Sequence, residues 1–420
     1  MASAAADHVS YDELYARWER GNWRAAEIDF TEDRRQWRDS FSELERRAAL
    51  WNYALFFHGE DAVTSNLSPF IDAAPRPEQR YYLATQQVDE ARHAVFFKRF
   101  MREVAELGDG TLAGGLEAIR PQLTWGFLKT FELLDRHAEE LRRDRSPAKL
   151  AQAVALYHIV IEATLAHPGQ HFIESYLGQR DLLPGFRRGM RNVALDEQRH
   201  IGFGVKLLRD LATVDSDVPE AVADLLREAL PYSAAVFVPP GWDRRYTECF
   251  GFTIEAIFEE AGRSLEGRLR AAGLPLESLP GPIPYPLDIA SSDRAAGIVA
   301  MLRAGLLGER NGPPPRDPAT LELLFESLRR GIDLRRAPAG PLTLQWEFAD
   351  AEPWHLRVED GSTAAAAGFV EGADVTLRVR YEDFVEMFAG RLDARRALAT
   401  GRLRPRGSVK ALWSTRRLFG

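Results

Sequence analysis

Apolar residues recur at helical spacing through the first two-thirds of the chain, and ionisable residues interrupt the apolar stripes. The first predicted helix begins near Ser40 and Glu43, which offer a capping box, and runs to about Leu67. The second begins at Pro77, a residue suited to the first turn of a helix. The two stripes are Phe56, Glu60, Val63 and Leu67, and then Tyr82, Gln86, Glu90, His93, Phe97 and Phe100. Both helices therefore place carboxylates where core residues are expected.

A second pair of helices repeats this arrangement. Ser146-Pro147 opens a helix that carries Glu162, and Pro168-Gly169 should bend it because proline removes a backbone hydrogen bond. Pro184-Gly185 precedes the next helix, whose stripe is Phe186, Met190, Val193, Glu197, His200, Gly204 and Leu207. A helix over 121–141 should connect the two pairs, and helices over 218–235 and 246–272 should cover them. The pattern predicts a four-helix bundle made of two antiparallel pairs.

The pattern changes after residue 275. Prolines gather at 275–286 and 313–315 on either side of a short apolar stretch at 298–307, which is typical of semi-rigid connectors. Beyond Pro318 the hydrophobic period becomes two, so 342–348 and 375–381 are predicted strands. We therefore predict a mainly α protein. A four-helix bundle with extra helices occupies 1–275, a proline-rich linker with a short helix 276–318, and a small α+β domain 319–420.

Composition and charge narrow the class of protein. The 420 residues carry a formal net charge of -8, which argues against nucleic acid as a partner. A single cysteine, Cys249, excludes an internal disulfide and fits a reducing cytoplasm. The first residues, Met1 to Leu14, lack the apolar core of a signal peptide, and no uninterrupted apolar run suggests an integral membrane segment. Basic residues gather near the C-terminus, either as a solvated helix face or as a patch for a membrane surface or an acidic ligand.

The most specific motif is the pentapeptide Asp-Glu-x-Arg-His, which occurs at 89–93 and again at 196–200. A Glu and a His three residues apart project from one helix face, so each pair can bind one metal ion. Each copy follows a lone glutamate on an apolar stripe. The predicted ligands are Glu60, Glu90, His93, Glu162, Glu197 and His200. Four carboxylates and two imidazoles balance two divalent cations and suit iron or manganese, as in ferritin-like carboxylate proteins. The alternative is a buried salt-bridge network.

Three neighbouring residues could support this site. Asp89 and Asp196 each precede a ligand glutamate and could hold the imidazoles in the required tautomer. Helix capping or a surface position is the alternative for both. His158 lies one turn before Glu162 and either reaches the site or is a hydrogen-bonded core histidine.

The chain resembles the ligand-binding oxidases of the ribonucleotide-reductase small-subunit superfamily. The stretches that carry the resemblance are 59–64 (GEDAVT), 89–97 and 157–162 (YHIVIE). The resemblance implies metal ligation by the six residues above, a mixed manganese and iron centre or a di-iron centre, and a bound fatty acid. It also implies an oxygen-dependent ether link between a valine and a tyrosine, for which Val63 and Tyr157 occupy matching positions. Otherwise Val63 fills the core and Tyr157 is a buried, hydrogen-bonded tyrosine.

A ribonucleotide-reductase subunit is a different function on the same scaffold. In those proteins the radical tyrosine lies one turn after the first ligand histidine, where this chain has Phe97. Phenylalanine cannot form a phenoxyl radical, so we do not expect reductase radical storage.

The region from about Leu321 to Phe419 resembles the sterol-carrier-protein domains, which bind lipids in an apolar tunnel. The resemblance rests on 381–384 (YEDF), 390–393 (GRLD), 401–404 (GRLR) with Gly407, and 417–419 (RLF). This region is also unusually rich in aromatic residues. Candidate lipid-binding residues are Trp346, Phe348, Phe384, Phe388 and Trp413. A packed core or an interface with the bundle explains the same surplus.

These observations predict an oxygen-activating dinuclear metal oxidase acting on a hydrophobic acyl, lipid or polyketide-like substrate, with O₂ as co-substrate. Electrons would come from an external donor or from the substrate, because the sequence has no flavin or nicotinamide fingerprint. The alternative is a lipid-binding carrier or sensor whose metals are structural. A homodimer is left open.

Overall fold

A computed structural model describes residues 9–310 and 312–418, which divide into two compact units at the boundary between Leu279 and Pro280. Met1 to His8, part of the stretch expected to lack a signal peptide, and Phe419 of the sterol-carrier resemblance lie outside the described residues. The mainly α fold class, with a small α+β region at the C-terminal end, is confirmed.

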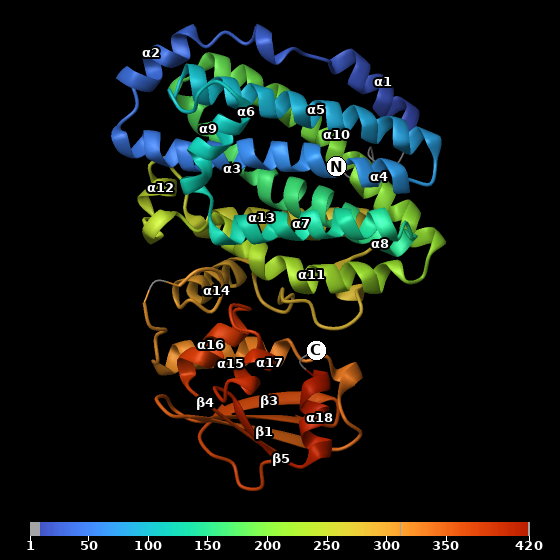
Figure 1. The fold of residues 1–420 in the computed structure, drawn as a ribbon, viewed down its shortest axis with the longest axis vertical. Coiled ribbons are helices and arrows are strands. Elements are labelled where there is room, and N and C mark those ends of the chain that lie inside the picture. Colours follow the sequence, from blue (N-terminus) through green and yellow to red (C-terminus); the bar gives the residue numbers. More distant parts are fainter. Residues whose placement is uncertain (1–8, 311, 419–420) are drawn as a thin grey trace. The chain divides into compact units, whose positions relative to one another are not determined.

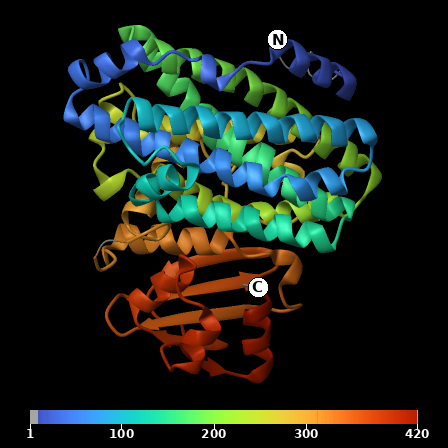
Figure 2. The ribbon, with the colours of Figure 1, turned by 45° about the horizontal axis from the view of Figure 1, so that its top comes forward.

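The first unit is built from helices (Figures 1 and 2). The four that carry the predicted ligands are α3 (Glu43–Asn66), α5 (Pro77–Glu103), the π-helix η4 (Ala155–Ala166) and α10 (Pro184–Val214). The α-helices around them are α1 (Tyr11–Gly21), α2 (Thr31–Asp39), α4 (Ser68–Ala73), α6 (Leu112–Ile119), α7 (Trp125–Arg143), α8 (Pro147–Val154), α9 (His167–Arg180), α11 (Val218–Ala234), α12 (Arg245–Glu248) and α13 (Ile254–Ala271). Short 3₁₀ turns are η2 (Ala25–Glu27), η3 (Arg120–Gln122), η5 (Ala235–Phe237), η6 (Pro240–Trp242) and η7 (Leu276–Ser278).

The capping box of α3 lies two residues later than predicted. Ser42, in extended conformation, accepts a hydrogen bond from the backbone N–H of Glu45, and the Glu45 side chain accepts one from the N–H of Ser42. Ser40 instead closes α2, where its N–H donates to the carbonyl of Gln36. The predicted start of the helix is wrong by two residues, because both Ser-x-x-Glu spacings, 40–43 and 42–45, fit a capping box. The start of α5 at Pro77 agrees with the prediction.

The helix that carries Glu162 is irregular just before Pro168. Its turns widen over Ala155–Ala166 into a π-helix, in which each N–H pairs with the carbonyl five residues earlier. In that register Pro168 would have paired with Ala163, but proline has no N–H. The hydroxyl of Ser264, on α13, donates to the Ala163 carbonyl at 2.6 Å. A side chain from another helix thus satisfies the carbonyl that proline leaves unpaired.

Close helix packing in the first unit depends on glycines of α10. A Cβ atom at Gly204 would lie 2.2 Å from the Cβ of His158 on η4. A Cβ atom at Gly189 would lie 2.1 Å from the ring of Phe96 on α5. Real Cβ atoms cannot approach so closely, so glycine lets α10 lie near both ligand helices.

The continuous helix Pro147–Arg180 is long and apolar enough to cross a membrane by length and composition. However, 78% of its most apolar window is buried inside the protein. It also carries Glu162, which is itself buried. It is therefore the core helix of the bundle.

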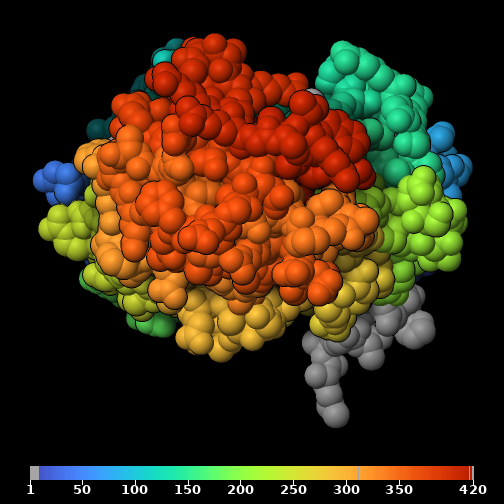
Figure 3. Space-filling view, turned by 90° about the horizontal axis from the view of Figure 1, so that it is seen from below, coloured from blue at the N-terminus to red at the C-terminus, as the bar shows by residue number. Residues whose placement is uncertain are grey.

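The second unit contains a five-stranded sheet. Its strands are β1 (Leu342–Phe348), β2 (Trp354–Glu359), β3 (Ser362–Ala367), β4 (Val375–Val379) and β5 (Arg404–Gly407), in the order β3-β2-β1-β4-β5. Within the described part of the chain, β1 and β4 pair in parallel, with Leu344 opposite Val375, and the other strand pairs are antiparallel. The helices are α14 (Ser291–Arg303), α15 (Pro318–Arg330), α16 (Tyr381–Phe388), α17 (Ala394–Ala399) and α18 (Val409–Leu418), with a 3₁₀ turn η8 (Leu334–Arg336). In the space-filling view of Figure 3, residues of this unit, orange to red, form one continuous surface.

Candidate metal centre

Four helices bring the six predicted ligands together inside the first unit. One potential metal-binding group consists of Glu60, Glu90, His93 and Glu197, and the other of Glu90, Glu162, Glu197 and His200. Within each group one ligand atom per residue lies within 4.8 Å of all the others, and all six side chains are buried. Glu90 and Glu197 belong to both groups. If two metal ions were bound, Glu90 and Glu197 would be the carboxylates available to both.

In each histidine the Nδ1 atom faces the carboxylates. His93 Nδ1 lies 3.2 Å from Glu60 Oε2 and 3.6 Å from carboxylate oxygens of Glu90 and Glu197. His200 Nδ1 lies 3.0 Å from Glu90 Oε1 and 3.4 Å from Glu162 Oε1. Both groups therefore present one nitrogen and three carboxylates to a common centre.

Unpaired polar atoms test whether metal ions fit this cluster. Glu162 Oε2, Glu197 Oε2 and His200 Nδ1 are buried and form no hydrogen bond among the described residues, because the short approach of His200 Nδ1 to Glu90 Oε1 lacks hydrogen-bond geometry. Leaving such atoms unsatisfied costs free energy, so a buried site normally supplies a partner for them. Carboxylate and imidazole donors at this spacing suit iron or manganese. Two such ions would provide partners for these three unpaired atoms. The residues present therefore fit a pair of metal ions.

The electrostatics of the cluster point the same way. Burial raises the pKa of Glu60 to about 8, although the charge of His93 acts in the opposite direction. Burial and the neighbouring charges of Glu162 and Glu90 raise the pKa of Glu197 well above its usual range. Without cations, the protein therefore disfavours the ionised forms of Glu60 and Glu197 in this buried space. Divalent cations would reverse this and stabilise the ionised form.

The outer nitrogen of each histidine is held by an aspartate of the other motif. His93 Nε2 lies 3.0 Å from Asp196 Oδ2, and His200 Nε2 lies 3.1 Å from Asp89 Oδ2. An aspartate at this nitrogen keeps the proton on Nε2 and leaves Nδ1 free for a metal ion. Sequence spacing predicted that these aspartates hold the imidazoles, but it could not show that the pairing crosses between the repeats.

Arginines and tryptophans complete this outer layer. Arg92 pairs with Asp89 and lies 3.1 Å from Asp196, and Arg199 pairs with Asp196. Burial alone would raise the pKa of Asp196, but the hydrogen bond and charge of His93 and the charge of Arg199 lower it. Two indole N–H groups also donate to the aspartates at 2.8 Å, Trp18 to Asp89 and Trp23 to Asp196. Neither tryptophan could be predicted from the motifs, because Trp18 lies in α1 and Trp23 just after it, far from either motif.

A second network surrounds Tyr157. Its hydroxyl donates to Glu90 Oε1 at 2.6 Å. The amide nitrogen of Gln86 donates to the Tyr157 oxygen at 2.8 Å and to Glu162 at 3.2 Å. His158 lies 3.3 Å from the Gln86 oxygen through Nε2, and burial together with the charge of His200 lowers its pKa to about 3. His158 is thus a neutral core residue that contacts Gln86. Gln86, which links all three residues, lay on the predicted stripe without an assigned role.

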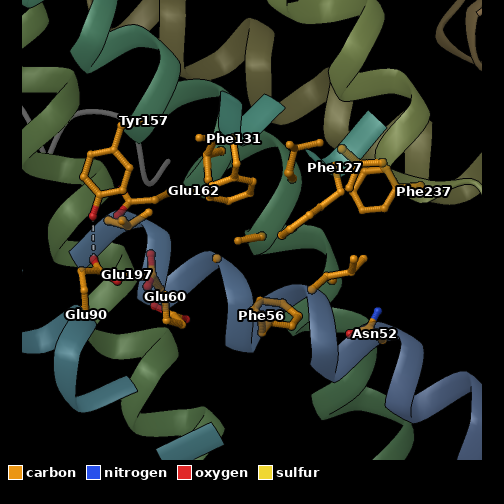
Figure 4. Close-up of a pocket in the computed structure, with 18 residues that line it drawn as sticks. Asn52, Phe56, Glu60, Glu90, Phe127, Phe131, Tyr157, Glu162, Glu197 and Phe237 are labelled. Carbon is orange, nitrogen blue, oxygen red and sulfur yellow. Dashed lines mark hydrogen bonds between the residues drawn. The ribbon is translucent and has the colours of Figure 1, made fainter. Parts of the chain in front are cut away.

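An apolar cavity adjoins the carboxylates (Figure 4). Glu60, Glu90, Glu162, Glu197 and Tyr157 line one part of it. Apolar side chains line most of the rest, among them Phe56, Val63, Phe127, Phe131, Ile161 and Phe237. Asn52 lies at the other end, away from Tyr157 and Glu197 (Figure 4). Val63 and Tyr157 therefore face one common space.

Phe97 lies in an aromatic core. Its side chain is fully buried, and its ring stacks on Phe56 with 5.7 Å between centroids. It also meets the rings of Phe96 and Phe186.

In the second unit, the candidate lipid-binding residues divide into two groups. Trp346, Phe348 and Phe384 pack around Phe325, with ring centroids 5.3, 6.2 and 5.7 Å from its own. Phe388 is partly buried against this core, whereas the Trp413 side chain is 60% exposed. Packing within the unit therefore accounts for most of the aromatic surplus.

Two family models match the chain. The model described as ribonucleotide reductase, small chain, matches residues 5–236, and the one described as the SCP-2 sterol transfer family matches residues 334–419. Among solved structures, two variants of an R2-like ligand-binding oxidase with an anaerobically reconstituted Mn/Fe cofactor are similar in fold. A glycine variant aligns with a TM-score of 0.53 and 24% identity over 63% of this chain and 94% of that chain. A valine variant aligns with a TM-score of 0.54 and 24% identity over 63% and 93%.

The small-chain model covers more than half of the 420 residues and includes all six candidate ligands. The structural likeness independently shows the same fold. The chain therefore belongs to the ribonucleotide reductase small-chain family and carries an SCP-2 domain at 334–419.

Proposed function

We propose that the protein is an oxygen-activating dinuclear metal oxidase that acts on a hydrophobic acyl, lipid or polyketide-like substrate. One observation carries the proposal: the buried carboxylates that form the two ligand groups also line an apolar cavity. A site that only stored metal would not need an apolar chamber beside it. A chamber of this kind can hold a hydrocarbon chain next to the place where oxygen reacts.

The six ligands would hold two transition-metal ions, Fe/Fe or Mn/Fe. When bound, these ions supply the redox chemistry that activates O₂. The Mn/Fe cofactor named for the similar structures supports this choice.

The protein's own residues would bind the substrate and control protons. Phe56, Phe127 and Phe131 keep water from the cavity and contact a hydrocarbon chain there. The Tyr157 hydroxyl, held by Gln86, keeps a proton at Glu90 Oε1. Burial and the charges of Glu162 and Glu90 raise the pKa of Tyr157 well above its usual range, so the phenol keeps this proton. Tyr157 thus offers an O–H group beside the candidate metal ligands.

Val63 and Tyr157 would be an internal target of the same chemistry. Joining the Tyr157 oxygen to a carbon of Val63 removes one O–H and one C–H hydrogen. These two electrons and two protons, together with two electrons from the reduced metal ions and two protons from solvent, would reduce O₂ to two molecules of water. The proposal is supported by the fact that both residues line the same cavity.

The experiment that tests the oxidase function is oxygen uptake. The full chain is loaded with Fe(II) or with Mn(II) and Fe(II) without oxygen, and O₂ consumption is then followed with and without a long-chain lipid. We expect lipid-dependent uptake that continues over many turnovers when a reductant is present. Glu162→Ala, which removes one ligand, should abolish it.

A second candidate is a lipid-binding carrier or sensor with structural metals. The match of residues 334–419 to the SCP-2 sterol transfer family favours it. In that case the protein would consume O₂ once or not at all, and added lipid would cause no further O₂ consumption. The same measurement therefore separates the two functions. We further propose that electrons come from an external donor or the substrate, and that the protein works in a reducing cytoplasm.

A further inference from the structure

A second cavity lies beside the one at the carboxylates. It is lined by residues of α3, α9, α12 and the 250–252 segment, among them Trp51, Tyr176, Tyr246 and Phe250, and by none of the candidate ligands. Four residues line both cavities: Asn52, Leu55, Gly169 and Phe237. The two cavities therefore meet at these four residues, and a long molecule that starts at the carboxylates can continue into the second cavity.

Two polar atoms at this junction lack partners. Asn52 Oδ1 and Trp51 Nε1 are buried and form no hydrogen bond with any described residue. Asn52 lines both cavities and Trp51 lines the second. A buried donor or acceptor without a partner costs free energy, and proteins rarely retain one. A ligand group that pairs with these atoms would offset this cost.

The surroundings specify what that group can be. The residues that line the second cavity include no Lys, Arg, Asp or Glu, so an ionised group would be buried there without a counter-charge. Trp51 Nε1 can only donate, so the ligand must accept. Asn52 offers a carbonyl oxygen, so the ligand must also donate. A neutral group with both capacities is a secondary amide or a hydroxyl.

We propose that the substrate is a long, neutral chain with an amide or hydroxyl group held at Asn52 and Trp51, while its apolar end lies at the carboxylates. Asn52 and Glu60 are eight residues apart on α3, which is about 12 Å along a helix. The polar group therefore lies well within the chain and is not its reacting end. The assignment of the reacting end rests on the proposed oxidase function. The assignment of the polar group does not.

Gly169 lies at the junction of the two cavities. It lines both, and a Cβ atom there would lie 3.3 Å from the ring of Phe56. A larger side chain at this position would fill the junction. Gly169→Leu is thus a variant that excludes long chains and admits short ones.

The test measures equilibrium binding to the metal-loaded full chain without oxygen, so no turnover is needed. The probes are N-hexyldecanamide and hexyl decanoate, which differ in one N–H, and a hexadecanol with a mid-chain hydroxyl. We expect the amide to bind about fivefold more tightly than the ester, the ratio that one neutral hydrogen bond contributes. The mid-chain alcohol shows whether a hydroxyl serves as well as the amide.

Variants locate the effect. Asn52→Leu should bring the amide-to-ester ratio to about one, and Trp51→Phe should weaken both probes about fivefold because each loses a donor to its carbonyl. Gly169→Leu should weaken the binding of both probes. It should leave the binding of decane, a chain short enough for the first cavity, unchanged. Equal affinity of amide and ester for the wild type would overturn the proposal, as would an unchanged ratio in Asn52→Leu. The wild-type comparison decides even if a variant fails to fold.

The two proposals fail separately. If the amide preference is found but oxygen uptake does not depend on lipid, the ligand site stands and the oxidase function falls. If uptake is lipid-dependent but amide and ester bind alike, the oxidase function stands and this ligand assignment falls.

Discussion

His93 donates through Nε2 to Asp196, 3.0 Å away, although the two residues lie 103 positions apart and belong to different copies of the same motif. His200 Nε2 donates in the same way to Asp89 Oδ2, 3.1 Å away. Each half of the bundle therefore orients the imidazole of the other half. Neither Glu-x-x-His helix can set its own ligand geometry alone, so the site should form only when α5 and α10 pack together.

This crossing predicts how substitutions combine. Asp196→Asn should lower the affinity for the ion bound by His93 roughly 10- to 100-fold, because the amide no longer accepts firmly from Nε2. Since Asp196 acts through His93, adding Asp196→Asn to His93→Ala should have little further effect. Adding it to His200→Ala should give the sum of the two losses. Chelator competition measures the affinities.

The matched control is Asp224→Asn, because Asp224 pairs with Arg227 on α11, away from both motifs. It should leave metal affinity unchanged. If Asp196→Asn were instead redundant with His200→Ala and additive with His93→Ala, the crossed pairing would be wrong.

The shared carboxylates predict a second pattern. Glu90 and Glu197 belong to both ligand groups, whereas Glu60 and Glu162 each belong to one. Glu90→Ala or Glu197→Ala should therefore reduce the content from two ions per chain towards none. Glu60→Ala or Glu162→Ala should remove about one. Elemental analysis after anaerobic loading gives the content, and circular dichroism shows whether the helices persist. Equal losses in all four variants would contradict shared ligation.

Much of the candidate site could be predicted from the sequence because helical periodicity converts spacing into direction. Glu90 and His93 must share a face, and a carboxylate such as Glu60 on an apolar stripe needs a partner. Three features of the site could not be predicted from the sequence. Tyr157 and Glu162 are five residues apart and point together only because η4 is a π-helix. The crossed aspartates depend on how α5 and α10 pack. Trp18 reaches Asp89 from α1, through a contact that no local pattern encodes.

Phe97 predicts the absence of reductase-type radical storage. Its fully buried ring stacks on Phe56 and has no hydroxyl to oxidise. Air added to the reduced, metal-loaded protein should therefore give oxidised-metal absorption without a long-lived phenoxyl signal in electron paramagnetic resonance. Tyr157→Phe is the control, because Tyr157 is a buried phenol beside the carboxylates. A stable tyrosyl signal in the wild type would refute the expectation.

Val63 and Tyr157 should become joined in part of the protein. Exposure of the reduced, loaded chain to O₂ should give a species two hydrogens lighter, because one O–H and one C–H hydrogen are lost. Intact-mass and peptide mass spectrometry detect it. Tyr157→Phe and Val63→Ala should both lack it, the first for want of a hydroxyl and the second for want of a tertiary C–H bond. If oxygen is consumed but the wild-type mass does not change, the oxidant acts on an external substrate alone.

Two neighbouring glycines of α10 provide a stability test of the close packing beside the site. A Cβ atom at Gly204 would lie 2.2 Å from His158, whereas one at Gly202 would meet nothing within 4 Å. Gly204→Ala should therefore lower the free energy of unfolding by roughly 1–3 kcal/mol, because a tightly packed interior cannot absorb an added methyl group. Gly202→Ala should raise it by about 0.5–1 kcal/mol, because alanine favours the helix.

Urea unfolding of the metal-free protein measures both changes without contributions from metal binding. Gly204→Ala should also weaken metal binding, because displacing His158 disturbs Gln86, which holds Tyr157 and Glu162. Gly202→Ala should leave metal binding as it is. Equal stability of the two variants would show that α10 and η4 are less closely packed than described. A destabilised Gly204→Ala with normal metal affinity would show that the Gln86 network does not transmit the displacement to the ligands.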